Sequence, residues 1–354
     1  MRPRCLRKRY RDRFTGVNLR PMLDSLPDWP DYGFSDDQRP ALRRLLASGR
    51  PAALATIAAL DGGGPRPVGT QMVFGEGVVS GFLSGGCVEG DVAGHAAGCL
   101  ADGEPRRLVY GAGSPWPDIR LLCGARIEIL VERLAPGDPA AAELFARMDA
   151  RRPSVWISDG RRRLCGDAGV AAWSDAVAVR QDPVWRLAVL GGDPTALAIA
   201  MLGAQSGLET TLIRPRGPSS PPPLAGVAYR RDDPGDALAA IGLDAWSAVA
   251  ICGHDIELDH AALMAALPSP APYVGLLGAR RRLVERLDRI KADGLTDRDL
   301  ARLRSPIGLD LGGKAPWEVA VATIGEIIAL RAATSERSPV LDLDQYRAAP
   351  IEAD

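Results

Sequence analysis

Long apolar runs, paired cysteines and an excess of charge of one sign are all missing from this chain of 354 residues. No stretch approaches the roughly 18 consecutive apolar residues that a membrane-spanning helix needs. The formal net charge of -1 gives no field that would favour nucleic acid or an anionic membrane as a partner. We therefore expect a cytoplasmic protein with no membrane span and no nucleic-acid partner.

The cysteines are few and scattered, without a CxxC pair or another short metal-ligand spacing. In a chain of this length such scatter is typical of a protein kept in a reducing compartment and argues against a disulfide scaffold. The six cysteines are Cys5, Cys87, Cys99, Cys123, Cys165 and Cys252.

The first 20 residues are rich in arginine and lack the apolar core of a secretory signal peptide. They are either a basic tail or an upstream extension of a protein that starts at Met22. The length of the rest suits two domains. We predict a loose tail over 1–35, a mixed α+β domain over 36–180, a second domain over 184–333 and a C-terminal tail over 334–354.

Periodicity in the first predicted domain alternates between helix and strand. Helices are expected over 36–48, 88–100 and 139–150, and strands over 52–60, 70–74, 78–83, 107–110, 127–131 and 153–158. The strands at 70–74 and 78–83 form a hairpin across a short glycine turn.

From residue 184 the rhythm changes to strand followed by helix. Such alternation predicts a doubly wound parallel sheet, so the fold class of the whole chain is α/β. Strands are expected over 186–190, 210–213, 248–251 and 273–276, and helices over 194–206, 259–266, 279–292 and 317–331.

A glycine-rich turn with one cysteine is the most informative motif. Gly85 and Gly86 precede Cys87 directly, and a predicted helix follows. A helix start stabilises a thiolate, which lowers the pKa of a cysteine placed there. The alternative is a glycine turn followed by a small, buried and inert cysteine.

A second cysteine meets a glycine at Cys123-Gly124, ahead of a predicted strand. Two such thiols in one domain could face one ligand, and thiolates suit soft transition metals. The alternative is that they lie far apart, each packed as a small hydrophobe.

The second predicted domain opens with a strand, a glycine turn and a helix, which is the context of a dinucleotide-binding turn. The glycine pattern does not fit, because Asp193 and Ala196 stand where GxGxxG needs glycine. Arg214 follows the next strand, where an acid would hold a ribose hydroxyl. The sequence therefore argues against NAD(P).

Two further turns of this domain are candidate sites. His254 and Asp255 follow a predicted strand and would form either an acid–base or anion-binding pair or a satisfied loop histidine. Gly278 and Arg280 precede a helix whose start is either an anion site or a solvated charged face. The glycine loop at 305–312 is a further candidate to line the same place.

Taken together, these motifs resemble the XdhC/CoxI family, the xanthine dehydrogenase accessory proteins. The resemblance covers roughly residues 40–332, in the family's order. The first family domain is matched by PRPxG at 65–69, SGGCVEG at 84–90 and CGxR at 123–126, and the second, Rossmann-like domain by GHDxxLD at 253–259, YVGLLGxRRR at 273–282 and PIGLDxG at 306–312.

The resemblance implies a molybdenum cofactor chaperone without turnover of its own. Family members bind the cofactor, protect it during sulfuration and insert it into a molybdenum hydroxylase such as xanthine dehydrogenase. It implies three partners: the apo-hydroxylase, a cysteine desulfurase and a second copy of the chain in a homodimer. The cofactor form, molybdopterin or its cytosine dinucleotide, stays open.

The resemblance also implies a site. Cys87 and Cys123 would contact the cofactor and its metal. The other expected cofactor-binding residues are Arg66, Gly85, Gly86, Glu89, Gly124, His254, Asp255, Gly278 and Arg280. Two other functions remain open, an NAD(P)-dependent oxidoreductase and a purely structural partner of a hydroxylase. A departure from the family is Gly253, where its members usually have threonine.

Overall fold

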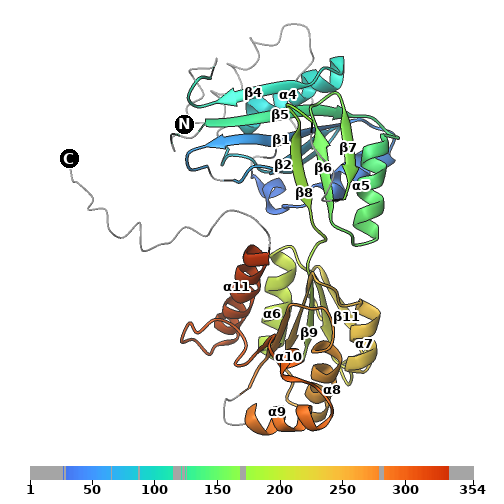
Figure 1. Cartoon of the computed structure of the whole chain (residues 1–354), viewed down its shortest axis with the longest axis vertical. Helices are drawn as coiled ribbons and strands as arrows, with labels where there is room; N and C mark the ends of the chain where they lie inside the picture. Colours follow the sequence, from blue (N-terminus) through green and yellow to red (C-terminus); the bar gives the residue numbers. More distant parts are fainter. Residues whose placement is uncertain are drawn as a thin grey trace, which may run out of the picture. The chain divides into compact units, whose positions relative to one another are not determined.

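In a computed structural model the chain forms two compact units, residues 1–183 and 184–354 (Figure 1). The residues that the structure describes are 27, 29–64, 66–86, 88–114, 121, 124, 126–167, 173–278 and 283–334. Cys87, Cys123 and Arg280 lie outside the described residues.

Unit 1, residues 1–183, is built on a five-stranded antiparallel sheet of order β3-β2-β1-β5-β4. Its strands are β1 Ala52–Asp61, β2 Gln71–Gly75, β3 Val78–Gly81, β4 Arg106–Tyr110 and β5 Arg126–Leu134. The predicted hairpin is therefore confirmed as β2 and β3.

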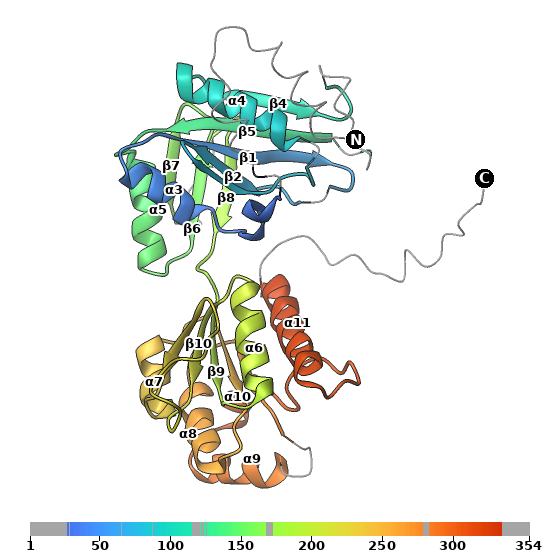
Figure 2. The same cartoon turned by 180° about the vertical axis from the view of Figure 1, so that it is seen from behind.

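Alternate residues of these strands enter two separate cores, as the period of two in a strand requires. Ala53, Ala55 and Ile57 of β1 pack with helix α4, Glu89–Asp102, on one face. Ala52 and Leu54 pack with α3, Arg39–Ala47, and α5, Pro139–Asp149, on the other. Figures 1 and 2 show α4 on the face of the sheet opposite to α3 and α5.

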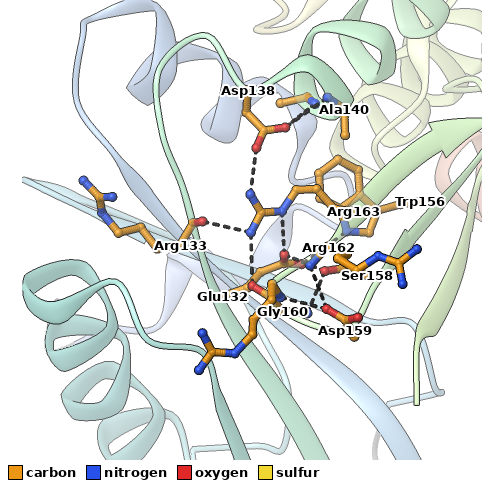
Figure 3. A network of polar contacts seen from close by, with 12 residues as sticks. Glu132, Arg133, Asp138, Ala140, Trp156, Ser158, Asp159, Gly160, Arg162 and Arg163 are labelled. Atoms are coloured by element: carbon orange, nitrogen blue, oxygen red, sulfur yellow. Dashed lines mark hydrogen bonds and ion pairs between the residues drawn. The ribbon is translucent and has the colours of Figure 1, made fainter. Parts of the chain in front are cut away.

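A second, three-stranded sheet, β7-β6-β8, covers the α5 side. It comprises β6 Ser154–Ser158, β7 Arg163–Gly166 and β8 Val177–Gln181. Of its three strands, the sequence predicts only the central one. A buried ion pair supplies the missing cause: Arg163 bonds Glu132 of β5 at 3.0 Å and Asp138 at 2.7 Å (Figure 3).

Unit 2, residues 184–354, holds a six-stranded parallel sheet of order β11-β10-β9-β12-β13-β14. This confirms the predicted doubly wound sheet. The strands are β9 Arg186–Leu190, β10 Glu209–Ile213, β11 Val227–Arg230, β12 Ser247–Ile251, β13 Tyr273–Leu276 and β14 Leu303–Arg304.

Helices cover both faces of this sheet (Figures 1 and 2). The core on one face takes its helical residues from α6 and α11, and the core on the other from α7, α8 and α9. The bounds are α6 Pro194–Gln205, α7 Pro234–Ile241, α8 Ile256–Ala266, α9 Leu283–Ala292, α10 Asp297–Leu300 and α11 Pro316–Thr334.

Two differences from the sequence prediction concern the site. Strand β11 and helix α7 were not expected at all. Helix α8 begins at Ile256 and not at residue 259, because the carboxylate of Asp255 accepts hydrogen bonds from the N–H groups of Glu257 and Leu258. Asp255 is therefore a helix cap as well as a candidate site residue.

Numbered from one in chain order, the strands of this sheet run 3-2-1-4-5-6, which is the order of dinucleotide-binding folds. The order reverses between β9 and β12. In such sheets ligands bind beyond the carboxyl ends of the two strands at that reversal, which we call the switch point. Two of the candidate turns of unit 2, at 191–193 and 253–255, lie there.

Candidate functional site

A buried carboxylate holds the turn that carries Cys87. The Glu89 side chain is 2% exposed and folds back under residues 83–88. One oxygen accepts from the backbone N–H of Leu83 at 3.0 Å and of Ser84 at 2.6 Å. The other accepts from the Ser84 hydroxyl at 2.8 Å and the Val88 N–H at 3.3 Å. The protein itself thus satisfies both oxygens of Glu89, whose place is to shape this loop.

Between these ties the loop runs out to the surface. Gly85 and Gly86 are exposed and have φ of 96° and 90°, values that an L side chain rarely adopts. A side chain built on either would meet nothing within 4 Å, so backbone conformation and not packing requires glycine here. The open space leaves room for a ligand beside both residues.

The short 3-10 helix η1, Asp31–Phe34, reaches the same loop. Tyr32 packs against the core of the α4 face. Burial raises the pKa of Tyr32 above its ordinary value, and the negative charges of Glu89 and then Asp31 raise it further. Neighbouring Trp29 and Phe34 are 82% and 87% exposed. Two exposed aromatic side chains therefore flank, in the sequence, a tyrosine whose pKa is raised by the Glu89 carboxylate.

A second buried carboxylate connects this loop to the end of β4. The Tyr110 hydroxyl donates to Asp91 of α4 at 2.6 Å, and His95 lies 3.6 Å from the same oxygen. Tyr110 is the register partner of Ile127, at the start of β5. The first turn of α4 and the start of β5 therefore lie at one end of the sheet.

The flanks of both cysteine motifs share one core. Leu83 and Val88 flank the first motif, Leu121 precedes the second, and all three belong to the α4-side cluster with Ile127. Gly124 is exposed, with a φ of 71°, and its N–H bonds the Leu121 carbonyl at 3.0 Å. Described neighbours of Cys87 and Cys123 thus belong to one core cluster of unit 1.

Arg66, another predicted site residue, is held by an ion pair with Asp36, just ahead of α3. Its Nε is buried without a partner among the described residues. Nearby Gly69 packs against Val179 of β8, and its N–H bonds the Ile57 carbonyl of β1. The segment 66–69 therefore connects the two sheets of unit 1.

In unit 2 the switch point is bridged by side chains. His254, after β12, lies 3.1 Å from Asp193, after β9. The other oxygen of Asp193 accepts the N–H of Ala196 at 2.8 Å and caps α6. Asp255 also bonds Arg216, after β10, at 2.9 Å. Three strand ends are linked in this way.

Asp193 and Arg216 were not among the predicted site residues. The pair Asp193-Pro194 is a helix-start signature, aspartate as cap and proline in the first turn, so the cap could have been found in the sequence. Nothing local in the sequence indicates that Arg216 crosses to Asp255, because 39 residues separate them.

Asp259, in the first turns of α8, is a further buried acid. Its side chain is 1% exposed and lies 3.2 Å from Arg286, while its Oδ1 has no hydrogen-bond partner among the described residues. Burial raises the pKa of Asp259, and the Arg286 charge opposes the rise only in part. A side chain at Gly253 would collide with that oxygen.

The cysteines that the structure describes are all buried. They are Cys99, Cys165 and Cys252, and burial raises the pKa of each thiol. In the described part of the chain no group of three or more His, Cys, Asp or Glu side chains could hold a metal ion. Nor does that part contain a helix long and apolar enough to cross a membrane. Gly278 is exposed after β13, and its predicted role stays a prediction.

Two family models match the chain, one in each unit. The model described as the XdhC and CoxI family matches residues 45–111, and the one described as the XdhC Rossmann domain matches residues 187–327. The first range contains the Gly85–Gly86 loop and the second contains the switch point.

Similar proteins match across both units. The molybdenum cofactor insertion chaperone PaoD of Escherichia coli is 30% identical, over 90% of this chain and 97% of its own length. A Bacillus subtilis protein described as a probable xanthine dehydrogenase subunit is 23% identical, over 82% of this chain and 96% of its own length. A crystal structure of a Bacillus halodurans protein, described as a xanthine dehydrogenase, superposes with a TM-score of 0.68 at 21% identity. The superposition covers 86% of this chain and 98% of that one, so the fold is shared.

Proposed function

Because this chain belongs to the XdhC and CoxI family, we propose that it binds the molybdenum cofactor and inserts it into a molybdenum hydroxylase of the xanthine dehydrogenase type. A relative of almost the same length is a cofactor insertion chaperone. The observation that carries the proposal is the shared core of the two cysteine motifs, since Leu83, Val88 and Leu121 belong to one cluster.

In this proposal Cys87 and Cys123 contact the cofactor, which is cargo. Thiolates suit a soft metal such as molybdenum. Glu89 acts through the loop and not through direct contact, because its oxygens already accept four hydrogen bonds. Gly85 and Gly86 leave open space in which the cofactor can approach the backbone.

The finer steps belong to the same proposal. The chain protects the cofactor while a cysteine desulfurase supplies its terminal sulfur, and then delivers it to the apo-hydroxylase. It catalyses no reaction of its own, works in the cytoplasm and pairs with a second copy of itself. The cofactor is carried as molybdopterin or as its cytosine dinucleotide.

The test is cofactor loading in cells that make the cofactor. We expect the purified wild type to carry molybdenum and pterin, measured by elemental analysis and by fluorescence of the oxidised pterin. Cys87→Ser and Cys123→Ser should each lose most of both. Cys5→Ser, outside every motif, is the control and should keep them.

A second readout follows delivery: the loaded protein should activate a purified apo-hydroxylase, and the two serine variants should not. Wild-type loading in the Cys87→Ser/Cys123→Ser double variant would refute the role of the thiols. A wild type without molybdenum or pterin would refute the function itself.

A second candidate function is an NAD(P)-dependent oxidoreductase, favoured by the strand order of unit 2. The carboxylate of Asp193 opposes it, since it occupies the start of α6, where a diphosphate would need free N–H donors. Calorimetry with NAD(H) and NADP(H) separates the two functions, and we expect NAD(H) not to bind even at millimolar concentration.

A further inference from the structure

An arginine that has no side-chain partner among the described residues lies beside the switch point of unit 2. Arg214 follows β10 directly and is exposed. Among the residues that the structure describes, none forms an ion pair or a side-chain hydrogen bond with its guanidinium. Its neighbours at the same edge of the sheet are paired: Arg216 bonds Asp255 at 2.9 Å and Arg230 bonds Asp232 at 2.8 Å.

Two glycines make room for the Arg214 side chain. A Cβ built on Gly192, after β9, would lie 2.7 Å from the Arg214 Cζ. A Cβ built on Gly217 would collide with the Tyr229 hydroxyl and lie 2.8 Å from the Arg214 Cδ. Both distances are shorter than real contacts, so any larger residue would displace the arginine. The guanidinium therefore rests on the backbone of the first turn of the fold.

A tight turn over residues 214–217 orients the Arg214 side chain. The Gly217 N–H bonds the Arg214 carbonyl at 2.9 Å, which closes a four-residue turn with Pro215 in its second position. Arg216, in the same turn, is tied across to the β12 end by its bond to Asp255. The turn is thus held at the β10 end by its own backbone and at the β12 end by an ion pair.

The end of the second strand is where dinucleotide-binding folds read the ribose, and arginine there accommodates a 2′-phosphate. The position of a diphosphate, however, is taken by Asp193, which caps α6 and pairs with His254. The site thus combines a cation that is unpaired within the described part of unit 2, available to one phosphate group, with a carboxylate that opposes a diphosphate.

We propose that Arg214, cradled by Gly192 and Gly217, is the receptor for a phosphomonoester at the switch point of unit 2. A guanidinium binds such a dianion through two parallel hydrogen bonds. The ligand class is a small molecule with a terminal phosphate monoester, and a molecule whose only phosphates form a diphosphate bridge is excluded. The site lies within unit 2 and involves neither Cys87 nor Cys123, so its test is independent of cofactor loading.

The experiment titrates the full-length protein with inorganic phosphate, AMP, NADP⁺ and NAD⁺ by calorimetry at low salt. We expect AMP and inorganic phosphate to bind, and NAD⁺ not to bind. AMP tighter than phosphate identifies a nucleotide-type ligand, and equal affinities identify a receptor for the phosphate group alone. Failure of both to bind at millimolar concentration would overturn the proposal. NADP⁺ carries both a phosphate monoester and a diphosphate, so we expect it to bind more weakly than AMP. If NAD⁺ bound as tightly as NADP⁺, the proposal would also be overturned.

Variants assign the binding to Arg214. Arg214→Gln should weaken phosphate and AMP binding about tenfold or more, since it removes a charge-assisted contact. The matched control is Arg230→Gln, because Arg230 is already paired with Asp232. This variant should bind both ligands like the wild type. Asp193→Asn keeps the capping oxygen but loses the charge, so it should bind more tightly. Unchanged affinity in Arg214→Gln, with a folded circular dichroism spectrum, would refute the assignment.

Discussion

At the scale of single residues, one carboxylate shapes the loop of the proposed cofactor site. The Glu89 carboxylate accepts hydrogen bonds from the backbone N–H groups of Leu83, Ser84 and Val88, all of them buried. Glu89→Ala should lower the free energy of unfolding by about 3 kcal/mol or more, because it leaves buried donors without acceptors. Chemical denaturation of the wild type and the variant measures the difference.

A surface glutamate gives the matched comparison. Glu76, at the tip of the β2–β3 hairpin, is 78% exposed and 3.6 Å from Arg50. Such surface pairs contribute little, so Glu76→Ala should change the free energy of unfolding by less than about 0.5 kcal/mol. Equal effects of the two substitutions would contradict the structural role of Glu89.

Thiol reactivity separates the proposed site cysteines from the core cysteines. Cys99, Cys165 and Cys252 are at most 5% exposed, and burial raises the pKa of each. In the folded protein we expect iodoacetamide to modify Cys87 and Cys123 while these three stay unmodified, as mass mapping would show. All should react in denaturant. Protection of Cys87 and Cys123 would instead favour a purely structural partner with inert thiols.

The buried acid of unit 2 gives a pH prediction. Burial raises the folded-state pKa of Asp259 above its unfolded value of about 3.9. Between those two values the folded state holds a proton that the unfolded state releases, so Asp259 lowers the free energy of unfolding as pH rises. Asp259→Asn should lack this decline in urea titrations made from about pH 4 upward. A wild-type slope in the variant would contradict the prediction.

The direction of a side chain was not predictable from the sequence. The sequence predicts Glu89 and Asp255 as site residues, but the Glu89 carboxylate bonds the backbone of its own loop, and one Asp255 oxygen caps its own helix while the other bonds Arg216. The orientation of a side chain depends on which donors surround it, and local spacing does not contain that information. From the sequence, Arg214 shows only that no acid follows the second strand, because the glycines around its side chain come from two separate segments.

At the scale of elements, the two sheets of unit 1 are joined by a buried polar network (Figure 3). The Glu132 carboxylate of β5 accepts from Trp156 and Ser158 of β6 and pairs with Arg163 of β7. Burial raises the pKa of Glu132, and the Arg163 charge only partly counters this. The network fixes the smaller sheet on the larger one.

Breaking one side of this ion pair should be costly. Arg163→Met leaves a buried carboxylate without its cation, so we expect a loss of about 3–5 kcal/mol in the free energy of unfolding. Glu132→Gln/Arg163→Met removes both charges and should cost less than Arg163→Met alone. Denaturation of the two variants measures this, and a double variant as unstable as the sum of its parts would contradict it.

Strand β7, which is held by such a long-range pair, is one of the elements that the sequence did not predict. Strands β9, β12 and β13 are short apolar runs followed by helical segments, and this local pattern was enough to predict them. Strand β7 carries Arg163 and reads as a loop, since the carboxylates that pair with it lie 31 and 25 residues away. Partners at that separation are invisible to a local pattern.

At the scale of the whole molecule, each unit has cores of its own. Those of unit 1 draw on residues 41–179 and those of unit 2 on residues 185–327. We expect residues 184–334 expressed alone to fold and to unfold in one cooperative transition. Circular dichroism and amide proton spectra test this, and a fragment without dispersed signals would contradict it. The α/β class and the change of rhythm near residue 184 were predictable, because both depend on periodicity alone.

The Glu89 carboxylate beneath the Gly85–Gly86 loop affects how fast the proposed cofactor could be captured and released. Because the Glu89 carboxylate already holds the loop at Ser84 and at Val88, we expect neither capture nor release of the proposed cargo to wait for folding of these loop ends. Affinity then depends on contacts at the tip, which an acceptor protein can outcompete. Under the proposed carrier function, delivery is then a competition between this loop and the acceptor protein for the cofactor, and the same molecule can bind a new cofactor without refolding its loop ends.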